Sequence, residues 1–369
     1  MAIPYSRYIV GSLPWYSVLM VSAILIAYLL GTREEKRIGL PKDSMLDMVL
    51  VAVPCGIVGA RLYYVLMTLD QFAKNPISIF YIWEGGIAVY GSIIGGALGV
   101  WIYCRIRKRS FAALLDITAP GLVLAQAIGR WGNYFNREAF GPVITNPAWQ
   151  FFPAGVLITE SGAQIWHVAT FFYESVWDLG VFFVLWAIRK RMKRRGDLFL
   201  WYMALYGCGR FLVEQLRTDS LYLFGYRASQ YVSLLICMVT ATVFLVRLAK
   251  QQQSRNWFVF LPGCLLAFAR PLLPQNTVGI ALTFALFAAS GLCLFRMPAA
   301  PRWVKYWLAA DLAVYLGILL SGNGWLWHSP YFVYAGLSIP PYLALPYTRL
   351  TDSPAQAAQP EVEHAHRED

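Results

Sequence analysis

The stretch GRWGNYFNREAFGP, residues 129–142, places charged and amide side chains directly after an apolar segment. The preceding residues, LDITAPGLVLAQAI, are apolar enough to cross a lipid bilayer. Charged side chains at the edge of lipid cost free energy unless they are paired or hydrated, and they usually mark functional sites. The stretch therefore predicts a membrane-spanning helix that ends in a polar site.

The composition of the whole chain agrees with a membrane protein. Of its 369 residues, 58% are hydrophobic and only 14% are charged, which is too apolar for a soluble domain of this length. Segments of about 20 apolar residues, the length that spans a bilayer, recur along it. They lie near 13–31, 46–67, 87–104, 112–128, 168–188, 198–213 and 230–247. The sequence predicts an all-α polytopic membrane protein with a seven-span core.

The remainder of the chain predicts further membrane spans. Apolar windows near 257–271, 278–295, 304–320 and 331–347 suggest about four additional spans. We therefore expect a core at 1–250, an accessory transmembrane module of unknown role at 251–350 and a disordered polar tail at 351–369. The N-terminus lacks the layout of a cleavable signal peptide, so the first window is expected to be a retained span.

Clusters of basic residues predict the orientation. REEKR (33–37), RIRKR (105–109) and RKRMKRR (189–195) follow the first, third and fifth windows, which is the pattern of cytoplasmic loops. This places the N-terminus outside, the C-terminus in the cytoplasm, and residues 139–166 in an outer cap. The clusters also explain the net charge of +11, so we expect no nucleic-acid partner. The six cysteines stand singly without metal-ligand spacing, so no metal or cofactor is predicted.

Further ionisable residues lie within or beside apolar windows. Arg61 stands in GIVGARLYYVL, and Arg210 and Glu214 stand four apart in YGCGRFLVEQLRTDS, on one face of a helix. Arg217, seven beyond Arg210, is expected on the same face. These residues could form internal ion pairs that tie helices together, or the arginines could bind phosphate, whose oxygens match the guanidinium fork.

The glycine-rich run WEGGIAVYGSIIGGALG, residues 83–99, also allows two interpretations. Gly85 and Gly86 favour a re-entrant turn whose backbone contacts a ligand. From Gly91 onward, a G-x-x-x-G pattern is equally typical of close helix packing.

Aromatic and acidic residues flank two windows. In WHVATFFYES, residues 166–175, a lone His167 is expected to be a hydrogen-bonded structural residue. Tyr173 and Glu174 are expected to brace the arginines. Tyr16, at the start of the first window, is either a ligand contact or a residue of the interfacial aromatic belt.

Together these motifs resemble the bacterial prolipoprotein diacylglyceryl transferase family. GRWGNYFNREAFG is similar to its signature G-R-x-G-N-F-x-N-x-E-x-x-G, and PWY, WEGGIAVYGSIIGG, FFYES and YGCGRFLVEQLRTD occur in the family's order over about residues 10–250. The resemblance implies a seven-span inner-membrane enzyme. It would move the diacylglyceryl group of phosphatidylglycerol to the lipobox cysteine thiol of prolipoprotein signal peptides, the first step of lipoprotein maturation.

The resemblance also implies roles for individual residues. Arg130 and Arg210 would hold the phosphate and glycerol head group, and Glu214 would orient Arg210. Gly129 and Gly132 would let the backbone turn close to the head group. The catalytic residues it suggests are Arg130, Arg210, Glu138 and Tyr90, and the substrate-binding residues are Asn133, Asn136, Gly129, Gly132, Glu214, Gly85, Gly86, Tyr16 and Arg217.

Two departures from the family pattern bear on the catalytic base. The family commonly has histidine followed by two glycines where this chain has Tyr90, Gly91 and Ser92, so a histidine base there is excluded. Tyr90 could act instead, because nearby arginines stabilise a phenolate. The segment HVATFFYE lacks the proline of the family pattern and is one residue longer, so His167 is given no catalytic role.

Two other functions fit part of the sequence. A transporter also has membrane spans and intramembrane charges, but it is expected to show repeated halves, which this sequence lacks. A family member that has lost activity is the second alternative, given Tyr90 and Ser92. For the transferase, the expected partners are phosphatidylglycerol, prolipoprotein signal peptides and membrane lipids.

Overall fold

The computed structural model describes residues 6–243, apart from 74, 161, 193, 215, 219–221, 224–225, 234, 237–238 and 241–242. These residues divide between two compact units, one within Met1–Tyr202 and Leu216–Asp219, the other within Met203–Gln215 and Ser220–Asp369. The predicted accessory spans and polar tail, residues 251–369, lie outside the described residues.

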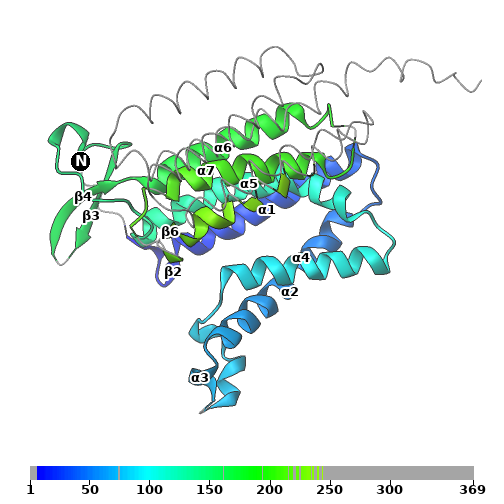
Figure 1. Ribbon diagram of the computed structural model, residues 1–369, viewed down its shortest axis with the longest axis horizontal. Coiled ribbons are helices and arrows are strands. Elements are labelled where there is room, and N and C mark those ends of the chain that lie inside the picture. Colours follow the sequence, from blue (N-terminus) through cyan, green and yellow to red (C-terminus); the bar gives the residue numbers. More distant parts are fainter. Residues whose placement is uncertain are drawn as a thin grey trace, which may run out of the picture. The chain divides into compact units, whose positions relative to one another are not determined.

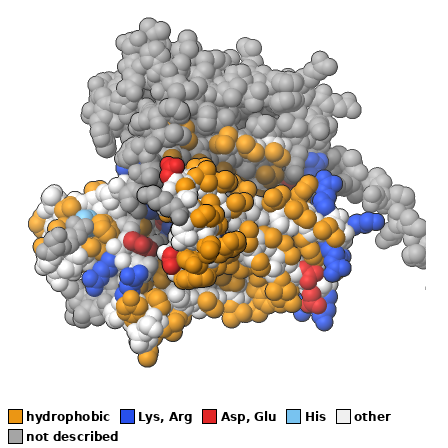
Figure 2. All heavy atoms as spheres, turned by 90° about the horizontal axis from the view of Figure 1, so that it is seen from below, with side chains coloured by type: hydrophobic (Ala, Val, Ile, Leu, Met, Phe, Trp, Pro, Cys, Tyr) orange, Lys and Arg blue, Asp and Glu red, His pale blue; other side chains and the backbone are white. Residues whose placement is uncertain are grey.

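The described part is mostly helical, as expected for a polytopic membrane protein. Five of its helices are long and apolar enough to cross a membrane, and they coincide with the first five apolar windows. They are α1 (Trp15–Arg37), α2 (Ser44–Met67), α4 (Val89–Ile106), α5 (Phe111–Asn136) and α6 (Thr170–Ile188). Figure 2 shows the result on one face, where hydrophobic side chains form a broad surface with basic side chains at its edge.

The sixth window is also helical, as α7 (Asp197–Glu214), but this helix carries an arginine and two acidic residues and is not among the five. The seventh window, 230–247, lies partly outside the described residues. The number of spans in the core therefore stays a prediction.

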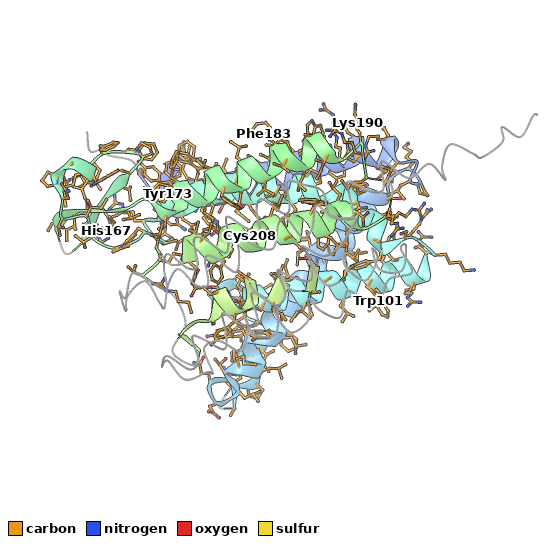
Figure 3. The ribbon with its side chains drawn as sticks, turned by 45° about the horizontal axis from the view of Figure 1, so that its top comes forward. Trp101, His167, Tyr173, Phe183, Lys190 and Cys208 are labelled. Carbon is orange, nitrogen blue, oxygen red and sulfur yellow. The ribbon has the colours of Figure 1, made fainter. Side chains whose placement is uncertain are left out.

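In the first unit, α5 packs between α1 and α6, and α2 packs along α4 (Figure 1). Short connections join α1 to α2, α4 to α5 and α6 to α7. The three basic clusters lie in these connections or in the last turns of the helices that precede them, so they lie at the same helix ends. Lys190 marks this basic end in Figure 3, and His167 lies at the opposite end of the bundle.

Small residues set the contact between α2 and α4. A Cβ added to Gly91 would lie 2.3 Å from the carbonyl oxygen of Gly59, and one added to Gly95 would lie 2.4 Å from that of Cys55. Both distances are too short for any side chain, so the two backbones touch. The packing interpretation of the G-x-x-x-G pattern is therefore correct.

The predicted cap, residues 139–166, is not a span. It contains the 3₁₀ turn η3 (Pro147–Trp149), and it is closed by an antiparallel hairpin of β3 (Gly155–Glu160) and β4 (Ala163–Val168). Gly162 supplies the positive φ of 85° at the turn, and the strands are rich in β-branched and aromatic residues. The description all-α therefore needs correction here.

Short elements complete the described part. Two further two-stranded sheets are present, β1 (Tyr8–Val10) with β2 (Leu13–Pro14) in the first unit and β5 (Tyr222–Leu223) with β6 (Tyr226–Arg227) in the second. Between α2 and α4 lie α3 (Leu69–Phe72), η1 (Pro76–Phe80) and η2 (Ile82–Glu84).

Candidate active site

The polar residues of the opening stretch form a network where α5 ends. The side-chain amides of Asn133 and Asn136 donate hydrogen bonds of 3.0 and 3.2 Å to the same carboxylate oxygen of Glu138. The chain reverses directly after the helix, because Arg137 and Ala139 adopt positive φ angles of 58° and 56°. This reversal brings Glu138 back over the last turn of α5.

Gly129 and Gly132 lie inside α5, so the expectation that the backbone turns at these glycines is wrong. Gly132 instead leaves room for a ring: a Cβ there would lie 2.5 Å from Cδ2 of Tyr16 on α1. Trp15 adds a second contact between the same helix ends by stacking on Phe135, with ring centroids 4.9 Å apart. Tyr16 is therefore brought beside the signature residues, which the sequence could not establish.

Arg130 is paired across helices. Its Nη2 lies 2.6 Å from Oε1 of Glu174 on α6, and the side chains are 22% and 4% exposed, respectively. The hydroxyl of Ser175 donates a hydrogen bond of 2.8 Å to the carbonyl oxygen of Ala127, which links the same two helices. The expectation that Glu174 braces an arginine is confirmed in geometry.

Tyr173 and His167 serve the cap. The Tyr173 hydroxyl donates a hydrogen bond of 2.7 Å to the carbonyl oxygen of Ala154, so this residue braces the cap rather than an arginine. His167 is buried in the hairpin, with Nδ1 2.9 Å from the carbonyl oxygen of Gly141 and its ring against Phe140. Figure 3 shows both residues near the hairpin end. The structural role expected for His167 agrees with these contacts.

The second unit holds the other arginine pair. Nη2 of Arg210 lies 2.6 Å from Oε2 of Glu214, one turn later on α7, and the side chains are 17% and 3% exposed. Arg227 also donates to the backbone carbonyl of Glu214. Because α7 ends at Glu214, Arg217 lies in the following loop and not on the helix face where it was expected.

The WEGG segment is held by an arginine to which the sequence assigned no site role. Arg61 is buried in α2, and its guanidinium donates to five backbone carbonyl oxygens at 2.6–3.4 Å. The acceptors are Ser78, Ile79, Tyr81, Gly85 and Gly86. The carbonyls of Gly85 and Gly86 thus face Arg61, and both glycines adopt positive φ angles, 92° and 72°. An arginine in an apolar window close to a glycine-rich run was the signal in the sequence, but its acceptors were not predictable.

Tyr90, in the first turn of α4, follows this segment closely. The residue is 44% exposed. The backbone amide of Ala88 donates a hydrogen bond of 3.1 Å to the carbonyl oxygen of Ala60, the residue beside Arg61. The start of α4 is thus fixed to α2 just before Tyr90.

Apolar helices that carry, near their ends, ion pairs between a buried glutamate and a partly exposed arginine define a polytopic membrane protein. The family model described as prolipoprotein diacylglyceryl transferase matches residues 7–246. The chain belongs to the prolipoprotein diacylglyceryl transferase family.

Individual relatives agree with this assignment. The chain is 41% identical over 242 residues to the phosphatidylglycerol–prolipoprotein diacylglyceryl transferase of Oceanobacillus iheyensis, a match covering 64% of this chain and 84% of the relative. It is 42% identical over 238 residues to the enzyme of the same name from Enterococcus faecalis, a match covering 63% of this chain and 86% of the relative. It is 40% identical over 245 residues to the enzyme of the same name from Streptococcus agalactiae serotype Ia, a match covering 66% of this chain and 95% of the relative. The family is therefore one of membrane transferases.

Proposed function

We propose that this chain transfers the diacylglyceryl group of phosphatidylglycerol to the lipobox cysteine of prolipoproteins, the first step of lipoprotein maturation. The observation that supports this most directly is family membership over residues 7–246, together with relatives whose names state this activity. The polar network of Asn133, Asn136 and Glu138 lies inside the matched region, at the end of an apolar helix.

The reaction is a displacement at carbon. The thiolate sulfur attacks the glycerol carbon that carries the phosphate, a C–S bond forms, and the C–O bond to the phosphate oxygen breaks. The leaving oxygen keeps the electron pair, so the products are the thioether and glycerol phosphate, and the thiol proton passes to a base. Such a reaction needs a deprotonated thiol and cations placed where negative charge develops.

Arg130 and Arg210 are our candidates for these cations. Each is paired with a glutamate that is almost fully buried, whereas the guanidinium remains more exposed. A guanidinium has five N–H donors, more than one carboxylate accepts, so it can hold a phosphate oxygen while its glutamate fixes its orientation. In this proposal, Glu174 positions Arg130 and Glu214 positions Arg210.

The remaining residues are assigned around these cations. Glu138, held by two amides, would fix the end of α5 near the head group. Tyr16 and the Gly85–Gly86 segment would line the substrate, with Arg217 as a further cation. Tyr90, at the position where the family commonly has histidine, is the candidate base.

We further propose that the protein lies in the bacterial cytoplasmic membrane with the cap on the outer side. The three basic clusters meet at the opposite helix ends from the cap, which fits cytoplasmic loops on the basic side. This orientation would present the polar network to the outer leaflet, where a signal-peptide cysteine emerges.

The decisive experiment combines purified full-length protein, phosphatidylglycerol and a lipobox peptide, with the product identified by mass spectrometry. We expect a peptide heavier by one diacylglyceryl group and equimolar glycerol phosphate. A peptide with serine in place of the cysteine is the matched control. A folded protein that gives no thioether would overturn the proposal and favour the inactive member. Movement of lipid between leaflets without a thioether would favour the transporter.

A further inference from the structure

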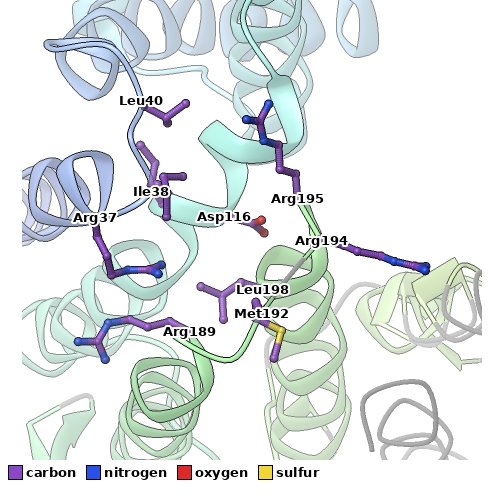
Figure 4. Close-up of a pocket in the computed structure, with 10 residues that line it drawn as sticks. Arg37, Ile38, Leu40, Asp116, Arg189, Met192, Arg194, Arg195 and Leu198 are labelled. Carbon is purple, nitrogen blue, oxygen red and sulfur yellow. The ribbon is translucent and has the colours of Figure 1, made fainter. Parts of the chain in front are cut away.

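A second charged site lies in the first unit, at the basic ends of the helices. A pocket of about 210 Å³ is formed between the end of α1, the first turns of α5 and the connection from α6 to α7 (Figure 4). Its lining includes Arg37, Asp116, Arg189 and Arg195 and the apolar residues Ile38 and Leu198. Asp116 precedes Arg130 on α5 by fourteen residues, or about 21 Å at the helix rise of 1.5 Å per residue. The pocket is therefore separate from the candidate active site.

One buried glutamate holds two of the arginines. Nη2 of Arg37 lies 2.6 Å from Oε2 of Glu34, and Nε of Arg189 lies 3.0 Å from Oε1 of the same carboxylate. Arg189 also donates to the carbonyl oxygen of Trp186 and stacks on its ring, 3.4 Å from the centroid. Both guanidiniums are thus fixed in place before any ligand arrives, and each has more N–H donors than Glu34 can accept.

The acidic residue that lines the pocket, Asp116, already accepts hydrogen bonds from the backbone. The two carboxylate oxygens of Asp116 accept backbone N–H groups of Gly196 and Phe199 at 2.5 and 2.9 Å. Asp116 therefore shapes the connection between α6 and α7. Arg194 and Arg195, on that connection, are both exposed and both line the pocket, and the Arg194 side chain points away from Asp116 (Figure 4).

The charge of the pocket favours an anion. Four arginines line the pocket, Arg37, Arg189, Arg194 and Arg195, and they outnumber the three carboxylates of Glu34, Asp116 and Asp197 that lie in or beside the lining. The carboxylates of Glu34 and Asp116 are turned toward their own donors. The volume is below the roughly 300–1,000 Å³ of pockets that enclose a drug-sized molecule. It suits a head group, and the apolar wall suits the carbon chain attached to one.

We propose that this pocket binds a phosphate group, carried either by an anionic phospholipid or by a soluble phosphate. Guanidinium forks match phosphate oxygens, and basic pockets between membrane helices on the cytoplasmic side typically take lipid head groups. The inference does not depend on the proposed transfer reaction, because it concerns residues at the other end of α5.

Hydrogen–deuterium exchange of the full-length protein tests the proposal locally, at residues 189–198. Three samples are compared: nanodiscs of phosphatidylcholine alone, the same with phosphatidylglycerol added, and phosphatidylcholine nanodiscs with inorganic phosphate. We expect slower exchange with phosphatidylglycerol if the source is lipid, and with inorganic phosphate if it is soluble. Unchanged exchange in both arms overturns the proposal.

Two variants and a control make the result specific. Arg195→Gln leaves the pair between Glu34 and its arginines intact, and Arg37→Gln removes a fixed cation. Each should weaken the ligand-dependent protection about tenfold, the effect of one hydrogen bond to a charged group. Arg107→Gln with Lys108→Gln removes basic charge between α4 and α5, outside the pocket lining, and should change nothing. Equal loss in the control and pocket variants would mean general attraction to charge, and would also overturn the proposal.

Discussion

Arg130 on α5 and Glu174 on α6 form an ion pair of 2.6 Å in which the carboxylate is buried and the guanidinium is partly exposed. The glutamate is enclosed, while part of the guanidinium stays accessible. This geometry is compatible with the proposed role of Arg130 as a cation that holds a phosphate oxygen while Glu174 orients it.

The first prediction concerns this arginine. Arg130→Ala should lower the rate of diacylglyceryl transfer about 100-fold or more, because one cation at the developing negative charge is lost. Arg130→Lys should restore little activity, since the bidentate fork is lost. Transfer to a lipobox peptide measures both. Lys190→Ala, an exposed cation at the basic end, is the control and should be near normal. Near-normal transfer by folded Arg130→Ala would remove Arg130 from the site.

The second prediction compares two helical glycines. Gly132→Ala on α5 should disturb the site, because the new methyl group would lie 2.5 Å from the Tyr16 ring and must displace it. Gly180→Ala on α6 is the matched control, because a Cβ there meets nothing within 4 Å. We expect transfer to fall about tenfold or more in Gly132→Ala alone, equivalent to about 1.4 kcal/mol. Equal rates in the two variants would show that the position of Tyr16 is irrelevant.

The third prediction concerns Arg61. Arg61→Met keeps the bulk of the side chain but leaves five backbone carbonyls without their donor, each worth about 1–3 kcal/mol if it stays buried. Hydrogen exchange should accelerate in residues 78–88, and transfer should fall with it. Arg105→Met, which removes an exposed arginine stacked on Trp101, should leave residues 78–88 unaffected. Unchanged hydrogen exchange of residues 78–88 in Arg61→Met would show that Arg61 does not hold this segment in place.

The fourth prediction concerns orientation. In a variant whose six native cysteines are replaced, Gln164→Cys in the cap should react with an impermeant maleimide applied to the outer face. Lys190→Cys at the basic end should react only after the membrane is opened. Labelling in the reverse order would move the candidate site to the cytoplasmic side.

The fifth prediction concerns the boundary of the transferase core. The family match ends at residue 246, and the motifs that carry the proposed chemistry end earlier. A chain truncated after Lys250 should therefore retain transfer activity. Its rate is compared with that of the full chain at equal amounts in the membrane. Complete loss of activity by a folded truncated protein would show that residues 251–369 belong to the catalytic unit.

Several features of the fold were predictable because they are encoded locally. Runs of apolar residues mark helices through hydropathy and length alone, and the first five windows agree with α1, α2, α4, α5 and α6. The hairpin in the cap was not predicted, because its two strands are only six residues long and lie outside the helix-length apolar windows. The prediction that Arg217 shares a helix face with Arg210 was wrong, because spacing alone does not show where a helix ends.

By itself, the sequence determined the membrane character, the family and the residue types of the site, since the signature residues 129–141 are contiguous. Only the tertiary structure decided which residues meet: Glu174 with Arg130, Tyr16 with Gly132, and Arg61 with the carbonyls of the WEGG segment. These partners are far apart in the chain, and no spacing rule connects them. Their pairing depends on how helices approach one another, which is set by small residues at the contacts and by the need of each buried charge for a partner.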